Sequence, residues 1–249
     1  MIELPAYAWA LLAVGALIVG VSKTALPGAA TLAVAVFAAL LPARSSTAAL
    51  LVLLIVGDVL ALTLYRRDAD WKSLWRLAPA VAAGIVVGAL FLALSDDLLV
   101  RRGIGAVLIL LVVVTVVLRR APARAAGGRL ALLGYGALGG FTTMVANAGG
   151  PVMSLYFLAA RFDVRAFLGT AAWFFAIVNI AKLPIVVGLG LLTAPVLWLD
   201  LVLVPAVLVG GLLGRLIAGR VTQRIFERAV LLLTGATALW LLAGPPWPP

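Results

Sequence analysis

The chain has 249 residues, of which 65% are hydrophobic and 11% are charged, and its mean hydropathy is +1.23. A soluble domain is about half apolar and a quarter charged, so this composition predicts an integral membrane protein. The net charge of +10 lies in short stretches between apolar segments, which favours cytoplasmic loops over a nucleic-acid surface. With no cysteine and no histidine, the sequence lacks disulfides and the commonest metal ligands, and we expect no metal or cofactor.

Continuous apolar runs predict helices along the whole chain. The strands of a membrane barrel would instead alternate apolar and polar residues. The expected segments, in chain order, are 6–21, 27–41, 46–65, 77–94, 103–118, 130–146, 149–160, 166–187, 196–218 and 226–243.

The first two segments form a broken pair. Ser22, Lys23 and Thr24 lie in the stretch GVSKTALPGAAT, residues 20–31, and are followed by a proline and a glycine. Proline interrupts helical hydrogen bonding and glycine adds backbone freedom. A lysine at membrane depth is costly, which favours a functional role for this stretch.

A second break is predicted in GGFTTMVANAGGPVMS, residues 139–154, which carries Thr142, Thr143 and Asn147 ahead of Pro151. Matching breaks in two halves of a transporter mark a binding site, and helices that begin there aim free N–H groups at an anion. The alternative is that the small residues only allow close helix packing. The substrate-binding residues predicted from the two breaks are Ser22, Lys23, Thr24, Thr142, Thr143 and Asn147.

Three more polar residues, Asp58, Asn179 and Lys182, interrupt apolar runs and are assigned to ion coupling or charge balance. Asn179 and Lys182 are three residues apart and share a helix face. An intramembrane carboxylate acts as a proton carrier or as the counter-ion of a lysine, and a static Asp58–lysine pair is the structural alternative. The coupling ion, a proton or sodium, is left open, because backbone carbonyls at the breaks are also suited to sodium.

The two halves of the chain resemble each other. Three residues of the first half, Pro79, Gly84 and Gly88, recur at the same spacing as Pro205, Gly210 and Gly214. Fourteen Lys and Arg residues fall on one side of the predicted spans and only three on the other, which places both termini outside the cytoplasm. The fold prediction is an all-α membrane protein of two inverted-topology repeats. Each repeat would hold a broken hairpin and about three spans. The repeats would cover residues 1–118 and 130–249, joined by a cytoplasmic Arg- and Gly-rich linker at 119–129.

The stretches GVSKTALPGAATL, GGFTTMVANAGGPVMSLY and FLGTAAWFFAIVNIAKLP resemble the sulfite exporter TauE/SafE family of bacterial membrane transporters. The resemblance covers nearly the whole chain. It implies a multi-pass carrier of the bacterial inner membrane with two homologous halves. It also implies transport of sulfite, sulfoacetate or related sulfur-containing or organic anions, without specifying which.

These observations predict a secondary transporter that works by alternating access with the anion held at the two breaks near the membrane midplane, and the family resemblance implies an exporter. No G-x-x-x-x-G-K-[ST] pattern is present, so ATP is not expected to drive it. An anion channel is the first alternative. A membrane enzyme is the second, but it would need a nucleophile with a base or a set of metal ligands, so no catalytic residue is assigned. The expected partners are a small anion and the lipid bilayer; the oligomeric state, the substrate and the direction of transport are not specified.

Overall fold

A computed structural model describes residues 4–25, 28–118, 129–217 and 223–243, and within these ranges all regular structure is helical. The helices are α1 (Ala6–Thr24), α2 (Ala30–Leu40), α3 (Ala43–Tyr65), α4 (Trp71–Leu94), α5 (Asp97–Leu118), α6 (Arg129–Ala146), α7 (Gly149–Ala159), α8 (Val164–Gly188), α9 (Ala194–Ile217) and α10 (Gln223–Ala243). Six of these helices are long and apolar enough to cross a membrane. The prediction of an all-α integral membrane protein is therefore confirmed.

Two helix pairs are interrupted where the sequence predicts breaks. The α1 and α2 helices have 19 and 11 residues, and α6 and α7 have 18 and 11. At 1.5 Å per residue, α2 and α7 are only about 16 Å long, which is too short to cross a hydrocarbon core of about 30 Å. Each packs back against the helix before it, so each pair forms a hairpin. Pro27 lies outside the described residues, whereas Pro151 lies in the first turn of α7.

The fourth helix of each half packs against the first helix of the other half: α4 against α6, and α9 against α1. A Cβ atom added at Gly140 of α6 would collide with the carbonyl oxygen of Val81 in α4. In the same way, a Cβ at Gly20 of α1 would collide with the carbonyl oxygen of Val207 in α9. Glycine at these positions lets the helix backbones touch, so the packing role proposed for small residues applies to Gly20 and Gly140.

In each half, the fourth helix thus packs on the first helix of the other half, which is the pattern expected if the two halves are similar. Gly84 lies against the carbonyl of Ala137, and its aligned residue Gly210 lies against the carbonyl of Leu17. The inverted repeats and their boundaries stay a prediction. The predicted linker lies outside the described residues, apart from Arg129, which begins α6.

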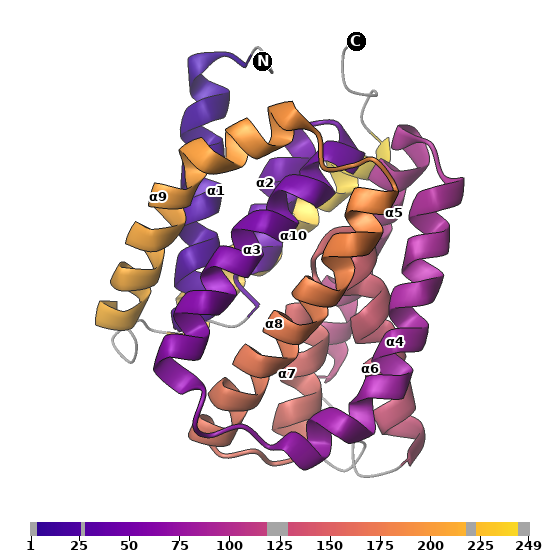
Figure 1. The fold of residues 1–249 in the computed structure, drawn as a ribbon, viewed down its shortest axis with the longest axis vertical. Helices are drawn as coiled ribbons and strands as arrows, with labels where there is room; N and C mark the ends of the chain where they lie inside the picture. The colour runs from indigo at the N-terminus through magenta and orange to yellow at the C-terminus, as the bar shows by residue number, and fades with distance from the viewer. Residues whose placement is uncertain (1–3, 26–27, 119–128, 218–222, 244–249) are drawn as a thin grey trace.

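Helices α3 and α8 run side by side through the middle of the molecule and carry Asp58 and Asn179 (Figure 1). The N-terminus of α3 is held by Asp97, whose carboxylate accepts hydrogen bonds from the backbone N–H groups of Ala43 and Arg44 at 3.1 and 3.0 Å. A carboxylate there satisfies orphan donors and complements the helix dipole. Asp163 caps α8 by accepting a hydrogen bond from the N–H of Ala166.

Candidate functional site

The two helix breaks meet each other. Gly28 precedes α2 with a φ of 101°, a backbone conformation that favours glycine. A Cβ added at Gly150, in the first turn of α7, would lie 3.4 Å from the backbone of Gly28. The residues on either side of the two breaks therefore surround a common space, although they are about 120 positions apart in the sequence.

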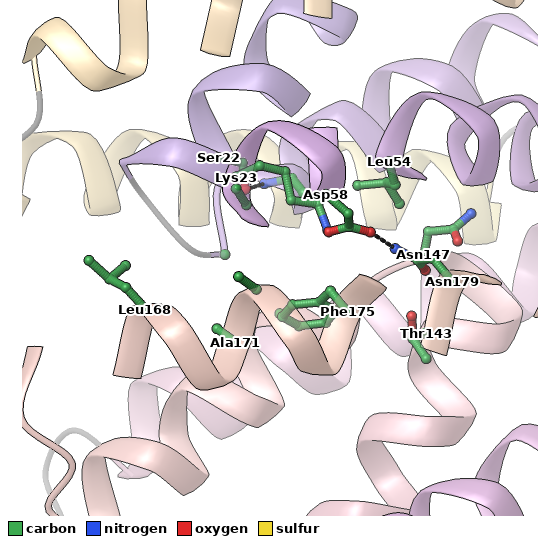
Figure 2. Close-up of a pocket in the computed structure, with 15 residues that line it drawn as sticks. Ser22, Lys23, Leu54, Asp58, Thr143, Asn147, Leu168, Ala171, Phe175 and Asn179 are labelled. Atoms are coloured by element: carbon green, nitrogen blue, oxygen red, sulfur yellow. Dashed lines mark hydrogen bonds and ion pairs between the residues drawn. The ribbon is translucent and has the colours of Figure 1, made fainter. Parts of the chain in front are cut away.

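That space is a small, partly open pocket with a cavity volume of about 40 Å³ between α1, α3, α8 and the α6–α7 break (Figure 2). Its apolar wall includes Phe175, Leu168 and Ala171 of α8 and Leu54 of α3. Its polar lining consists of Ser22, Lys23, Asp58, Thr143, Asn147 and Asn179. Six of the nine residues assigned from the sequence thus line one pocket.

Lys23 and Asp58 form an ion pair inside this pocket. Lys23 Nζ lies 2.6 Å from Asp58 Oδ1, and the two side chains are only 9% and 2% exposed. The ammonium also lies 4.6 Å from the ring centroid of Phe175, a cation–π contact. The charge of Lys23 is therefore balanced by Asp58 in this structure.

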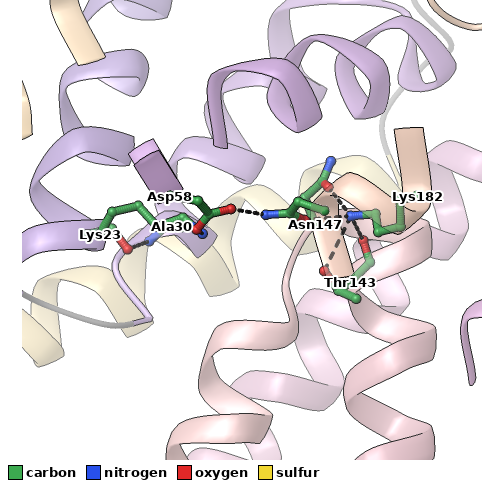
Figure 3. A network of polar contacts seen from close by, with 8 residues as sticks. Lys23, Ala30, Asp58, Thr143, Asn147 and Lys182 are labelled. Carbon is green, nitrogen blue, oxygen red and sulfur yellow. Dashed lines mark hydrogen bonds and ion pairs between the residues drawn. The ribbon is translucent and has the colours of Figure 1, made fainter. Parts of the chain in front are cut away.

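Asn179 links this pair to the second buried lysine, Lys182, which lies beside Thr143 and Asn147 in Figure 3. Its Nδ2 donates to Asp58 Oδ2 at 2.7 Å, and its Oδ1 accepts from Lys182 Nζ at 3.3 Å. Lys182 is 0% exposed and also donates to the carbonyl oxygen of Thr143 at 2.7 Å and to Asn147 Oδ1 at 2.6 Å. One network of hydrogen bonds thus runs from α1 through α3 and α8 to the α6–α7 break.

With every group counted as ionised, the network holds two ammonium groups and one carboxylate, Lys23, Lys182 and Asp58, and its formal charge is +1. A charge buried at membrane depth is costly unless something compensates it. An anion placed in the pocket would supply that compensation.

The sequence profile described as Sulfite exporter TauE/SafE matches residues 11–241, nearly the whole chain. The chain belongs to the TauE/SafE family. The resemblance noted from the sequence is confirmed, and the family is one of membrane transporters that export sulfite and related anions. Searches of curated proteins and of solved structures find no match.

Three residues assigned from the sequence do not line the pocket of this TauE/SafE protein. Thr24 Oγ1 donates to the carbonyl of Gly211 at 3.0 Å, across the α1–α9 contact. Thr142 Oγ1 donates to the carbonyl of Leu138 at 2.8 Å, within its own helix. Lys182 lies behind Thr143 and Asn147. Substrate contact stays a prediction for Thr24 and Thr142, and a role in charge balance stays a prediction for Lys182.

Two of the pocket-lining residues also hold the breaks in shape. Ser22 Oγ accepts a hydrogen bond from the N–H of Ala30 at 3.1 Å, which caps α2 across the break. Asn147 has a φ of 52°, and its Nδ2 donates to the carbonyl oxygen of Thr47 at 2.8 Å. Asparagine adopts this left-handed conformation more readily than most residues, so Asn147 fits the turn between α6 and α7.

The sequence analysis did not assign Phe175 and Tyr65. Phe175 forms a wall of the pocket beneath Lys23, and its position four residues before Asn179 places both on one face of α8, a signal that the sequence contains. Tyr65, at the end of α3, donates its hydroxyl to the carbonyl oxygen of Thr24 at 2.7 Å and so satisfies an acceptor at the end of α1. No spacing in the sequence indicates that contact, because the residues are 41 positions apart.

Proposed function

We propose that this TauE/SafE protein is a secondary carrier of the bacterial inner membrane that exports a small sulfur-containing or organic anion, such as sulfite or sulfoacetate. The observation that carries the proposal is the pocket between the two breaks, whose polar network joins two lysines to a single carboxylate. The anion binds in this pocket, and alternating access exposes it to each side of the membrane in turn.

The donors available to an anion come from both sides of the pocket. Lys23 has three N–H donors and uses one on Asp58. Thr143 contributes its hydroxyl, and Gly150 lies in the first turn of α7, where backbone N–H groups have no partner within the helix. Lys182 adds a positive charge from behind without touching the anion. Such a donor set suits the oxygens of a small oxyanion.

Proton coupling follows from the Lys23–Asp58 pair in this proposal. An ionised Asp58 competes with the substrate for Lys23. Protonation of Asp58 removes that competition and frees Lys23 for the anion. Binding of anion and proton would then be mutually favourable, as linkage requires.

The proposal is tested with purified protein in liposomes. Anion binding and counterflow are measured for sulfite, thiosulfate, sulfoacetate, sulfate and small carboxylates. A carrier saturates and shows counterflow, whereas a channel shows no counterflow. Folded Lys23→Met should lose anion binding, while Lys72→Met, at the exposed start of α4, should retain it. Unchanged anion affinity in folded Lys23→Met would show that the anion does not bind in this pocket.

A further inference from the structure

Lys182 is surrounded by oxygens that carry no full charge. Its Nζ lies 2.7 Å from the carbonyl oxygen of Thr143, 2.6 Å from Asn147 Oδ1, 3.3 Å from Asn179 Oδ1 and 3.4 Å from Thr143 Oγ1. Among the described residues, the carboxylate nearest in the network is Asp58, and it reaches Lys182 only through Asn179. Lys23 has a direct carboxylate partner; Lys182 has an oxygen cage instead.

The two asparagines are oriented by their other hydrogen bonds. Asn147 Nδ2 donates to the carbonyl oxygen of Thr47, and Asn179 Nδ2 donates to Asp58 Oδ2. Each asparagine must therefore turn its oxygen toward Lys182. Three carbonyl-type oxygens, which can only accept, converge on one nitrogen, and an ammonium has the three N–H donors to match. This set of acceptors is one that a charged lysine can satisfy with all three of its N–H groups.

The same cage has the chemistry of a site for a small hard cation. Such cations are bound by carbonyl and side-chain amide oxygens. Thr143 lies in the last turn of α6, where the negative end of the helix dipole adds to the attraction. In secondary transporters, carbonyls at the ends of broken helices coordinate sodium. Here the fully buried ammonium of Lys182 already occupies the position.

We propose that Lys182 is a tethered cation: its ammonium permanently fills a monovalent-cation site at the α6–α7 break, so the protein needs no free sodium there. The positive charge would then stay with the protein throughout a transport cycle. The consequence for transport rests on the proposed carrier function, whereas occupation of the site does not.

The test is to vacate the cage and offer sodium. Lys182→Ala removes the ammonium together with the side-chain stem, so no methyl group remains beside the vacated position. The melting temperature of the purified protein is compared in 100 mM NaCl and in 100 mM choline chloride. We expect no difference for the wild type and a rise of about 3 °C in sodium for Lys182→Ala, the shift expected from weak cation binding to a protein of this size. Lys72→Ala, which removes an exposed lysine, is the matched control and should show no sodium effect.

Each outcome decides for or against the proposal. If Lys182→Ala can be purified in NaCl but not in choline chloride, sodium rescues the variant, which supports the proposal. A folded Lys182→Ala whose melting temperature does not respond to sodium, or a variant that folds in neither salt, overturns the proposal, because a vacated cation site should accept the ion. The melting experiment needs no anion, so a failure of the carrier hypothesis would appear separately, as absent counterflow with the sodium response intact.

Discussion

Neutralising Asp58 should show that its charge is coupled more strongly to Lys23 than to Lys182. The Asp58 carboxylate is 2% exposed and lies 2.6 Å from Lys23 Nζ. Removing one partner of a buried pair strands the other charge and typically costs about 3–5 kcal/mol. Asp58→Asn alone should therefore lower the melting temperature by roughly 10 °C, and Lys23→Met alone by a similar amount.

The double change should recover most of that loss. Replacing both members of a buried ion pair by neutral side chains of similar volume is often close to neutral. In Lys23→Met with Asp58→Asn, no charge of the pair is left stranded, and Asn179 can still hydrogen-bond to an asparagine at position 58. We expect the two changes to be non-additive by at least about 2 kcal/mol, a coupling typical of residues in direct contact.

Lys182→Met with Asp58→Asn is the matched comparison. The sequence left open that Lys182 balances Asp58, but in the structure the two are joined only through Asn179. Their coupling should therefore be smaller, below about 1 kcal/mol.

The assay is the apparent melting temperature of all single and double variants, purified in one detergent and buffer. Substrate-free buffer is used so that anion binding does not contribute. Additive effects of Lys23→Met and Asp58→Asn would refute the ion pair as described. A larger coupling for Lys182 than for Lys23 would show that the charge of Asp58 is balanced mainly by Lys182.

Three further predictions test the fold around the site. Gly140→Ala should lower stability by about 1–3 kcal/mol, because its Cβ would strike the backbone of α4, whereas Gly134→Ala on the same helix has open space and should be neutral or stabilising; thermal unfolding distinguishes them. Burial raises the pKa of Asp70, but hydrogen bonds from Ser73 outweigh this and hold it below its usual value. This α4 cap should therefore contribute about 1 kcal/mol above pH 4 and lose it as the pH falls further, with Asp70→Ala showing no such loss in a pH series of melts. A cysteine at Ala69, between α3 and α4, should react with an impermeant thiol reagent only from the cytoplasmic side, and labelling in intact cells would reverse the predicted orientation.

The sequence was sufficient to predict the ten helices. Continuous apolar runs placed every predicted segment end within six residues of the corresponding helix end, and Pro151 fell in the first turn of α7 as expected. These features are local, because helix length depends on apolar runs, and helix interruption on proline and glycine. The same apolar runs predicted the fold class, an all-α membrane protein.

The roles of neighbouring polar residues could not be predicted in this way. Lys23 and Thr24 are adjacent, but consecutive residues on a helix point about 100° apart. Lys23 therefore faces the pocket while Thr24 faces α9. In the same way, Thr142 hydrogen-bonds within α6, whereas the adjacent Thr143 lines the pocket. Which face of a helix meets the pocket depends on packing between the halves, which no local pattern specifies.

Charge is distributed unevenly between the two predicted halves around the pocket. Asp58 and Asn179 align in the predicted repeat, and both belong to the same hydrogen-bond network. On the Asp58 side, the carboxylate balances the charge of Lys23. On the Asn179 side, an amide replaces the carboxylate, and the acceptors that Lys182 finds among the described residues are neutral. If the predicted repeat is correct, its two halves thus contribute an ion pair and a lysine without a direct carboxylate partner to one hydrogen-bond network. In the proposed carrier, an anion bound in this pocket would lie in a field that points from Lys182 toward Asp58. If the carrier works by alternating access as proposed, the access to the anion would change while the positive charge of Lys182 stays in place.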